Sequence, residues 1–345
     1  MKTKNFLKIF AVLGFSILMF TSCGGKGESP EQVIENFKTN LTEIKSGDIS
    51  TEVVMTGTDA QDAIDFTADM DIKFDRNDLE DRKADVNITL SGFMKAGDKS
   101  LEGDVDFTIR TFADNFYIRL DTLDSSDEGI AKFQPYISKY IGKWLHVASD
   151  FIPENIRELQ QKDEATLEKE RQLKELFVTT DLFMVTKEYG FETVNGTKVY
   201  HYGVQFSEEG VKDYIRKAAI IDGRELTDAE IEEASKIISY VSNAELWIGA
   251  RDYYLYKAAI YMTGGVMAES DADMSINVTI EGTDYNKTIK ITEPEDTEEF
   301  NPLELLMAFS TFSMEMDEAD TLDDGMMMDE MMMDEMMGDM AEDME

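Results

Sequence analysis

The most regular pattern in the chain is an alternation of apolar and polar residues between positions 49 and 120. In AIDFTADMDIKF, residues 63–74, apolar side chains occupy every second position and polar side chains lie between them. DVNITLSGFM (85–94), LEGDVDFTIR (101–110) and NFYIRL (115–120) continue this period of two. Each segment therefore predicts a strand with one apolar face. The short polar turns between the segments predict an antiparallel meander of about five strands.

Helical spacing of apolar residues predicts the elements around this meander. Ser29 and Pro30 are good residues for a helix start, and Thr227 with Glu230 forms the signature of a capping box. Asn195-Gly196 is the strongest short hairpin signal in the chain. The expected helices cover about 30–45, 126–141, 154–177, 207–219 and 227–243. Further strands are expected in GKWLHV, in the hairpin around Asn195, and in the segments ELWIGARDYYLYKAAIYMT, DMSINVTIEGTDYN and TIKITEP.

These elements fall into two blocks, 49–147 and 150–294, with no obvious linker between them. The simplest arrangement is an α+β fold with one long, strongly curved antiparallel sheet. An apolar sheet face has to be covered, so we expect the helices to pack on the concave, apolar face.

The only cysteine of the chain, Cys23, follows a tripartite N-terminal segment. Three lysines precede an apolar run from Ile9 to Phe20, and Thr21 and Ser22 are small. This order is typical of a secretory signal, and the run is shorter than the roughly 20 apolar residues of a spanning helix. The segment resembles the lipobox of bacterial lipoproteins, with Phe20 in place of the usual leucine. The resemblance implies cleavage after Ser22 and a lipid on the Cys23 thiol. An ordinary secreted protein with a free or buried thiol is the alternative.

Several short motifs occur in a recognisable order. NFYIRLDTL and a predicted helix precede YIGKWLHV, and VNGTKVYHYGVQF, LWIGARDYYLYKAAI and DYNKTIKITEPED follow. Over about 30–297 this order resembles the lipid-binding lipoproteins of the LppX/LprG type and their LolA-like relatives. The resemblance implies a half-open β-barrel, with helices across its mouth and an apolar cavity that carries lipid. The helix at 154–177 and the acidic load depart from the better-known members.

The apolar stripes of the meander are the candidate ligand lining. They comprise Ile64, Phe66, Met70, Ile72, Val86, Ile88, Phe107, Ile109, Phe116 and Ile118. A core filled by the protein's own side chains is the alternative.

Composition excludes several other partners and activities. The net charge of −39 opposes binding to nucleic acid and to anionic lipid headgroups. The chain has no G-x-S-x-G elbow, P-loop or H-E-x-x-H motif, so we expect no catalysis and no cofactor. His146 and His201 are its only histidines, and a metal site would need both to converge with carboxylates. We therefore expect no metal site. Trp144 and Trp247 are expected to pack in the core or at strand edges, and a role in admitting ligand is the alternative.

The last 32 positions, 314–345, contain no lysine or arginine and repeat MMMDE. Charge repulsion and low complexity predict a solvated tail. Capture of Cu(I) by thioethers and a helix formed against a basic partner are the alternatives. The expected organisation is a signal peptide at 1–22, a lipidated tether at 23–29, the LolA/LppX-like domain at 30–313 and the tail.

The sequence thus favours an extracytoplasmic lipoprotein, anchored to a bacterial membrane through Cys23, that binds or carries a lipid or other apolar ligand. Two alternatives stay open. One is a non-carrier envelope lipoprotein whose core is filled and whose acidic surface contacts other proteins. The other is a lipoprotein that handles copper through its methionine-rich tail.

Overall fold

All elements described below come from one of two compact units of the chain. The computed structural model describes residues 28–58, 63–78, 81–96, 99–112, 115–148, 151–152, 164–264 and 273–300. They belong to the unit Met1–Asn301, and Pro302–Glu345 forms the other unit. The expected lipid attachment at Cys23 and the tail 314–345 lie outside the described residues.

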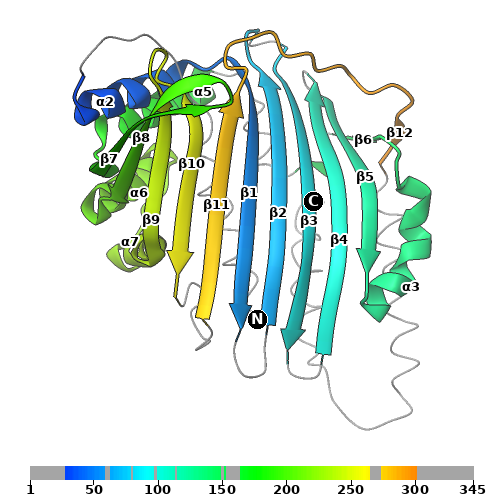
Figure 1. Cartoon of the computed structure of the whole chain (residues 1–345). Coiled ribbons are helices and arrows are strands. Elements are labelled where there is room, and N and C mark those ends of the chain that lie inside the picture. Colours follow the sequence, from blue (N-terminus) through cyan, green and yellow to red (C-terminus); the bar gives the residue numbers. More distant parts are fainter. Residues whose placement is uncertain are drawn as a thin grey trace. The chain divides into compact units, whose positions relative to one another are not determined.

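Twelve strands of the described residues form a single sheet in the order β12-β6-β5-β4-β3-β2-β1-β11-β10-β9-β8-β7 (Figure 1). The strands of the first half are β1 (Ser46–Thr58), β2 (Ala63–Asp75), β3 (Lys83–Ala96), β4 (Lys99–Phe112), β5 (Asn115–Ser125) and β6 (Leu145–Val147). Those of the second half are β7 (Phe183–Val194), β8 (Thr197–Phe206), β9 (Val241–Gly249), β10 (Leu255–Thr263), β11 (Asp273–Thr283) and β12 (Glu298–Glu299). Only the short β12–β6 pair is parallel.

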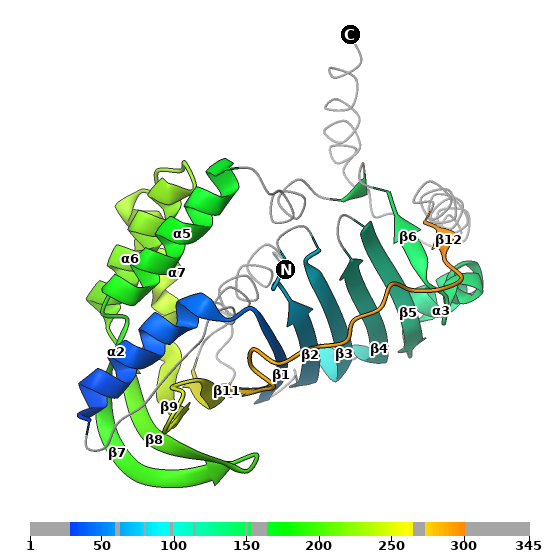
Figure 2. The ribbon, with the colours of Figure 1, turned by 90° about the horizontal axis from the view of Figure 1, so that it is seen from above.

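Pairing of β1 with β11 joins the two halves. The register runs from Asp48 opposite Thr283 to Thr58 opposite Asp273. Because this pairing is continuous, the two sequence blocks share one sheet. The sheet is curved and does not close (Figure 2), which confirms the expected fold class.

Five α-helices are described. They are α2 (Pro30–Asn40), α3 (Glu128–Ile137), α5 (Glu164–Thr179), α6 (Glu208–Ile221) and α7 (Asp228–Ser235). Figure 2 shows α2, α5, α6 and α7 together on the inner side of the curved sheet, whereas α3 lies at the β5–β6 end. Val33, Ile34 and Phe37 of α2 are buried in one cluster with Ile49 of β1 and Phe74 of β2. The helices α2, α5, α6 and α7 therefore lie on the apolar face, as expected, whereas α3 does not.

Local signals place several element ends correctly. The Gln32 backbone N–H donates to Ser29 Oγ at the start of α2. Both halves of the capping box of Thr227 and Glu230 are formed at the start of α7. Asn195 and Gly196 have φ of 49° and 79°. This left-handed pair is the conformation that a two-residue hairpin turn requires, and it joins β7 to β8.

Two expected helices end earlier in the structure than predicted. The first helix ends at Asn40, and a 3₁₀ turn follows to Glu43. The helix expected to reach residue 243 ends at Ser235, and after a 3₁₀ turn β9 begins at Val241, which pairs with Met262 of β10. In both places the chain has to enter a strand of the sheet. Strand pairing therefore ends the helix before the helical spacing of apolar residues ends.

The prediction of a strand at TIKITEP, residues 288–294, is wrong. Residues 286–297 contain no strand, and the only strand of this C-terminal segment is Glu298–Glu299. The backbone carbonyl of Thr292 instead accepts a hydrogen bond from the side chain of Arg110 on β4, at 3.0 Å. The segment thus crosses the first half of the sheet and does not extend its edge.

Candidate functional site

One face of β2–β5 is apolar from strand to strand. The pairing register places Val86 of β3 opposite both Ile72 and Ile109. Ile109 in turn lies opposite Ile118 of β5. All ten residues expected to line a ligand share this face: Ile64, Phe66, Met70, Ile72, Val86, Ile88, Phe107, Ile109, Phe116 and Ile118.

The helices cover this face unevenly. Ile49 of β1 lies under α2 and is only 1% exposed. All ten residues of the candidate lining are only partly buried. Within the described parts of the chain, seven of them neither belong to a buried cluster nor pack against one: Met70, Val86, Ile88, Phe107, Ile109, Phe116 and Ile118. The described residues therefore do not seal the apolar surface over β3–β5, although a role of these side chains in binding stays a prediction.

A pocket lies at one end of this surface. Its volume is about 680 Å³, within the usual range of small-molecule sites. Its walls come from the connection between α2 and β1, the turn after β2, helix α5 and the segment after β11. The lining residues are Thr42, Glu43, Ile44, Lys45, Arg76, Arg82, Glu170, Lys174 and Asn286.

Charge in the pocket is organised around Glu170. Its Oε1 lies 3.2 Å from Nη1 of Arg82. Burial lowers the pKa of Arg76, and the nearby Glu170 opposes that shift while Arg82 adds to it. Burial likewise lowers the pKa of Lys174, with the same opposing effect of Glu170. Each cation therefore lacks part of its hydration, and one carboxylate compensates for it.

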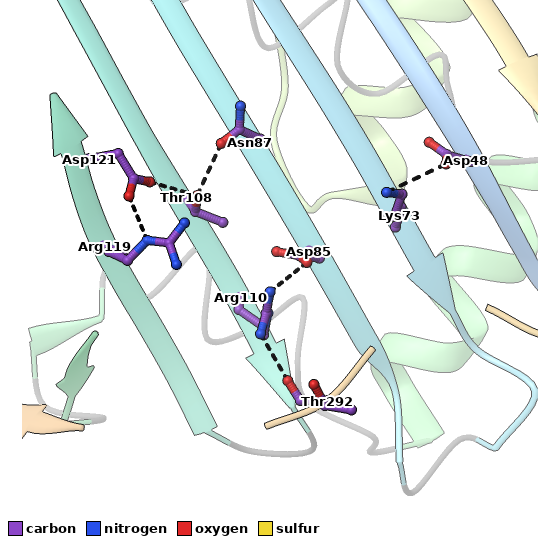
Figure 3. Close-up of polar contacts among 9 residues, drawn as sticks. All are labelled: Asp48, Lys73, Asp85, Asn87, Thr108, Arg110, Arg119, Asp121 and Thr292. Carbon is purple, nitrogen blue, oxygen red and sulfur yellow. Dashed lines mark hydrogen bonds and ion pairs between the residues drawn. The ribbon is translucent and has the colours of Figure 1, made fainter. Parts of the chain in front are cut away.

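The opposite face of β1–β5 carries a ladder of polar contacts (Figure 3). Arg110 lies 2.7 Å from Asp85 across the β3–β4 pair, and Asp121 and Arg119 pair at 2.7 Å on β5. Thr108 Oγ1 donates to Asn87 at 3.0 Å. The Arg110–Asp85 and Thr108–Asn87 contacts link neighbouring strands, although Asp85 Oδ1 and Arg110 Nε are buried without a hydrogen-bond partner among the described residues. This face is therefore a structural polar surface, and the apolar face opposite is the candidate site.

Trp144 and His146 lie away from the apolar face. Two guanidinium groups stack on the Trp144 ring, those of Arg110 at 4.6 Å and Arg119 at 4.7 Å from its centroid. His146 Nδ1 lies 3.0 Å from Glu299. Both contacts hold the β6 edge of the sheet, as expected for strand-edge packing.

His201 and Trp247 form a second aromatic group. The two rings stack at 4.1 Å, and Nδ1 of His201 lies 2.8 Å from Glu192. The two histidines therefore contact different partners and do not converge. Across the part of the chain that is described, no group of three or more His, Cys, Asp or Glu side chains could hold a metal ion.

The pocket cations were not identified from sequence. Arg76 and Arg82 occur in DRNDLEDRK, residues 75–83, among more acids than bases, and Lys174 lies in a charged helix about 90 positions later. The segment offers one sequence signal of a cationic site, which is the pair of arginines on either side of the turn between two strands. Only the packing of α5 against this turn brings the cations together.

Comparisons with known proteins return solved structures alone, since no family model and no curated protein sequence matches the chain. The lipoprotein LppX of Mycobacterium tuberculosis is 12% identical, with a TM-score of 0.28 over 77% of this chain and 100% of that one. A LolA superfamily protein of Nitrosomonas europaea is 6% identical, with a TM-score of 0.18 over 77% of this chain and 96% of the other. An outer-membrane lipoprotein-sorting protein domain of Vibrio parahaemolyticus is 10% identical, with a TM-score of 0.15 over 71% and 87%.

The names of these proteins are those of the LppX and LolA-like family that the sequence resembles. Their TM-scores all lie below 0.5, so the fold class follows from the sheet of this chain, and the likeness carries no argument about function. No helix among the described residues has the length and apolar character needed to cross a membrane.

Proposed function

We propose that this chain is an extracytoplasmic lipoprotein that binds a lipid or other apolar ligand on the inner face of its curved sheet, without catalysing a reaction. The observation that carries the proposal is the apolar surface of β3–β5. There the side chains Val86, Ile109 and Ile118 form a row on the face that the helices use, yet remain partly exposed.

The physical reason for binding is the cost of leaving such a surface in water. Contiguous apolar patches of more than a few hundred Å² are uncommon on monomeric soluble proteins and mark sites of interaction. Each methylene of an acyl chain that leaves water contributes about 0.8 kcal/mol. A chain lying across several strands would therefore bind without any polar contact.

Attachment to a membrane belongs to the same proposal. It rests on the three lysines, the apolar run and the cysteine of the first 23 positions. An anchored carrier would hold its open face near a source of acyl chains.

The test compares two neighbouring positions on β2. Met70 belongs to the apolar face, where it lies opposite Ile88, whereas Asp71 is exposed on the polar face opposite Asn87. Met70→Glu places a carboxylate where acyl chains would lie, and desolvating it costs several kcal/mol. We expect lipid that co-purifies with the full chain to fall at least about tenfold in this variant, as measured by mass spectrometry of an organic extract.

Asp71→Glu is the matched control, because it places the same side chain one residue away on the other face. It should retain wild-type amounts of lipid. Wild-type protein that carries no lipid, or equal retention by both variants, would contradict the proposal and favour a non-carrier envelope protein.

A further inference from the structure

The pocket beside the apolar face carries an excess of positive charge. Four cationic side chains line it against two carboxylates, which leaves a formal excess of two positive charges. The cations are Lys45, Arg76, Arg82 and Lys174, and the carboxylates are Glu43 and Glu170. The whole chain has 72 acidic and 33 basic residues. Chance placement would therefore give a pocket with acids in excess.

The described part of the chain neutralises the cations only in part. Glu170 forms an ion pair with Arg82, but no described carboxylate lies within ion-pair distance of Arg76 or Lys174. Nε of Arg82 is buried and has no hydrogen-bond partner among the described residues. Guanidinium donors bind phosphate and carboxylate groups strongly, often through two parallel hydrogen bonds. The pocket thus offers donors for an anion from outside the chain.

The pocket shares a wall with the apolar face. Ile44 lines the pocket and belongs to the same buried cluster as Ile49 and Phe74, against which Ile72 of the candidate lining packs. The guanidinium carbon of Arg76 lies 5.6 Å from the centroid of the Phe74 ring. Charged and apolar surfaces therefore meet at Phe74. A molecule with an anionic end and an apolar body would contact both.

We propose that this pocket binds the anionic head group, a phosphate or carboxylate, of an acyl lipid whose chains lie on the apolar face of β2–β5. Arg76, Arg82 and Lys174 would contact the head group, and Ile44 and Phe74 the first methylenes. This assignment rests on the proposed function, because the acyl chains need the apolar face.

The experiment uses the full chain with Cys23→Ala, which removes the expected acyl acceptor, after bound lipid has been stripped. Binding is measured by native mass spectrometry for three probes. These are dioleoyl phosphatidic acid, the dioleoylglycerol with the same acyl chains, and inorganic phosphate. We expect phosphatidic acid to bind at least about tenfold more tightly than dioleoylglycerol, because hydrogen bonds to a charged group contribute more than neutral ones. Inorganic phosphate should bind far more weakly than phosphatidic acid.

Paired variants locate the preference. Arg76→Gln with Arg82→Gln should remove the preference for phosphatidic acid and leave dioleoylglycerol binding unchanged. Arg76→Lys with Arg82→Lys keeps the positive charge and should retain most of the preference for phosphatidic acid. The control, Arg224→Gln with Arg251→Gln, removes the same charge from two exposed arginines outside the pocket and should behave as wild type. Denaturant midpoints of all variants would identify any loss of folding.

The outcomes separate the two proposals. Equal binding of both lipids by wild-type protein would overturn the head-group assignment and leave the proposed function intact. Inorganic phosphate that binds as tightly as phosphatidic acid would also overturn it and identify a site for a free anion. If neither lipid binds, the proposed function fails and the head-group assignment fails with it.

Discussion

His201 on β8 is held on every side by its neighbours. Its ring lies 4.2 Å from that of Tyr189 and 4.1 Å from that of Trp247. Nδ1 lies 2.8 Å from Glu192, and Nε2 lies 3.1 Å from Glu245. The two stacked rings and the two carboxylates therefore fix the orientation of the imidazole.

This cluster gives a prediction about pH. Hydrogen bonds from Trp247 and His201 hold the pKa of Glu192 below its ordinary value. Because the folded-state pKa is depressed, the carboxylate stabilises the folded protein above the ordinary glutamate pKa. That contribution is lost as the pH falls through the lowered value. Glu192→Gln should therefore reduce the free energy of unfolding at pH 7, and the difference from wild type should shrink towards pH 3.

Urea denaturation at a series of pH values measures this difference. Glu52→Gln, an exposed strand carboxylate on β1, serves as the control and should give a small and nearly constant difference. A Glu192→Gln difference that does not change with pH would show that the hydrogen bonds of Glu192 do not stabilise the fold.

At the scale of elements, the C-terminal segment 286–299 fastens the first half of the sheet. The Asn286 backbone N–H donates to the carbonyl of Ser46, where β1 begins. Further on, the Tyr117 hydroxyl donates to Glu293, and β12 pairs with β6. The segment thus connects β1, β5 and β6, and Asn286 at its start also lines the candidate pocket.

Tyr117 offers a test of this fastening. Burial, together with its hydrogen bond to Glu293, raises the pKa of Tyr117 to about 12, so the hydroxyl remains a donor at neutral pH. Tyr117→Phe removes that donor and should lower the free energy of unfolding by about 1.5–3 kcal/mol, the usual value for a hydrogen bond to a charged group. We expect faster hydrogen exchange in residues 288–299 than in wild type, measured by mass spectrometry. Tyr261→Phe, at an exposed position on β10, should leave this exchange unchanged.

At the scale of the whole molecule, charge decides how the chain can attach to a membrane. The net charge of −39 opposes approach to anionic headgroups. A single acyl chain gives only weak, reversible membrane binding, whereas more than one chain anchors stably. The membrane attachment that we propose would therefore depend on the expected lipid at Cys23.

Cys23→Ser tests the anchor in cells that process lipoproteins. It should move the protein from the membrane fraction to the soluble extracytoplasmic fraction, as followed by immunoblotting of separated fractions. Ser22→Ala keeps a small residue before the cysteine and should leave the protein in the membrane. An unmodified Cys23 thiol in the mature wild-type protein, detected by peptide mass, would refute the anchor.

Sequence alone determined the features that depend on neighbouring residues. The alternation in 63–74 identified the strand face, because successive side chains point to opposite sides of a strand. Asn195-Gly196 and the Thr227 capping box were identified because each is satisfied within four residues. The ten candidate lining residues lie on one face for the same reason, since strands in register preserve the alternation.

Only the tertiary structure decided what depends on contacts between distant segments. TIKITEP has strand-like alternation, yet hydrogen bonds from β4 and β5 hold this segment across the sheet. The β1–β11 pairing joined two halves more than 200 positions apart. The pocket forms only where the segment of Arg82 packs against the helix that carries Glu170. No local pattern encodes such a meeting, because the energy of an ion pair depends on distance and burial, which arise only when the chain has folded.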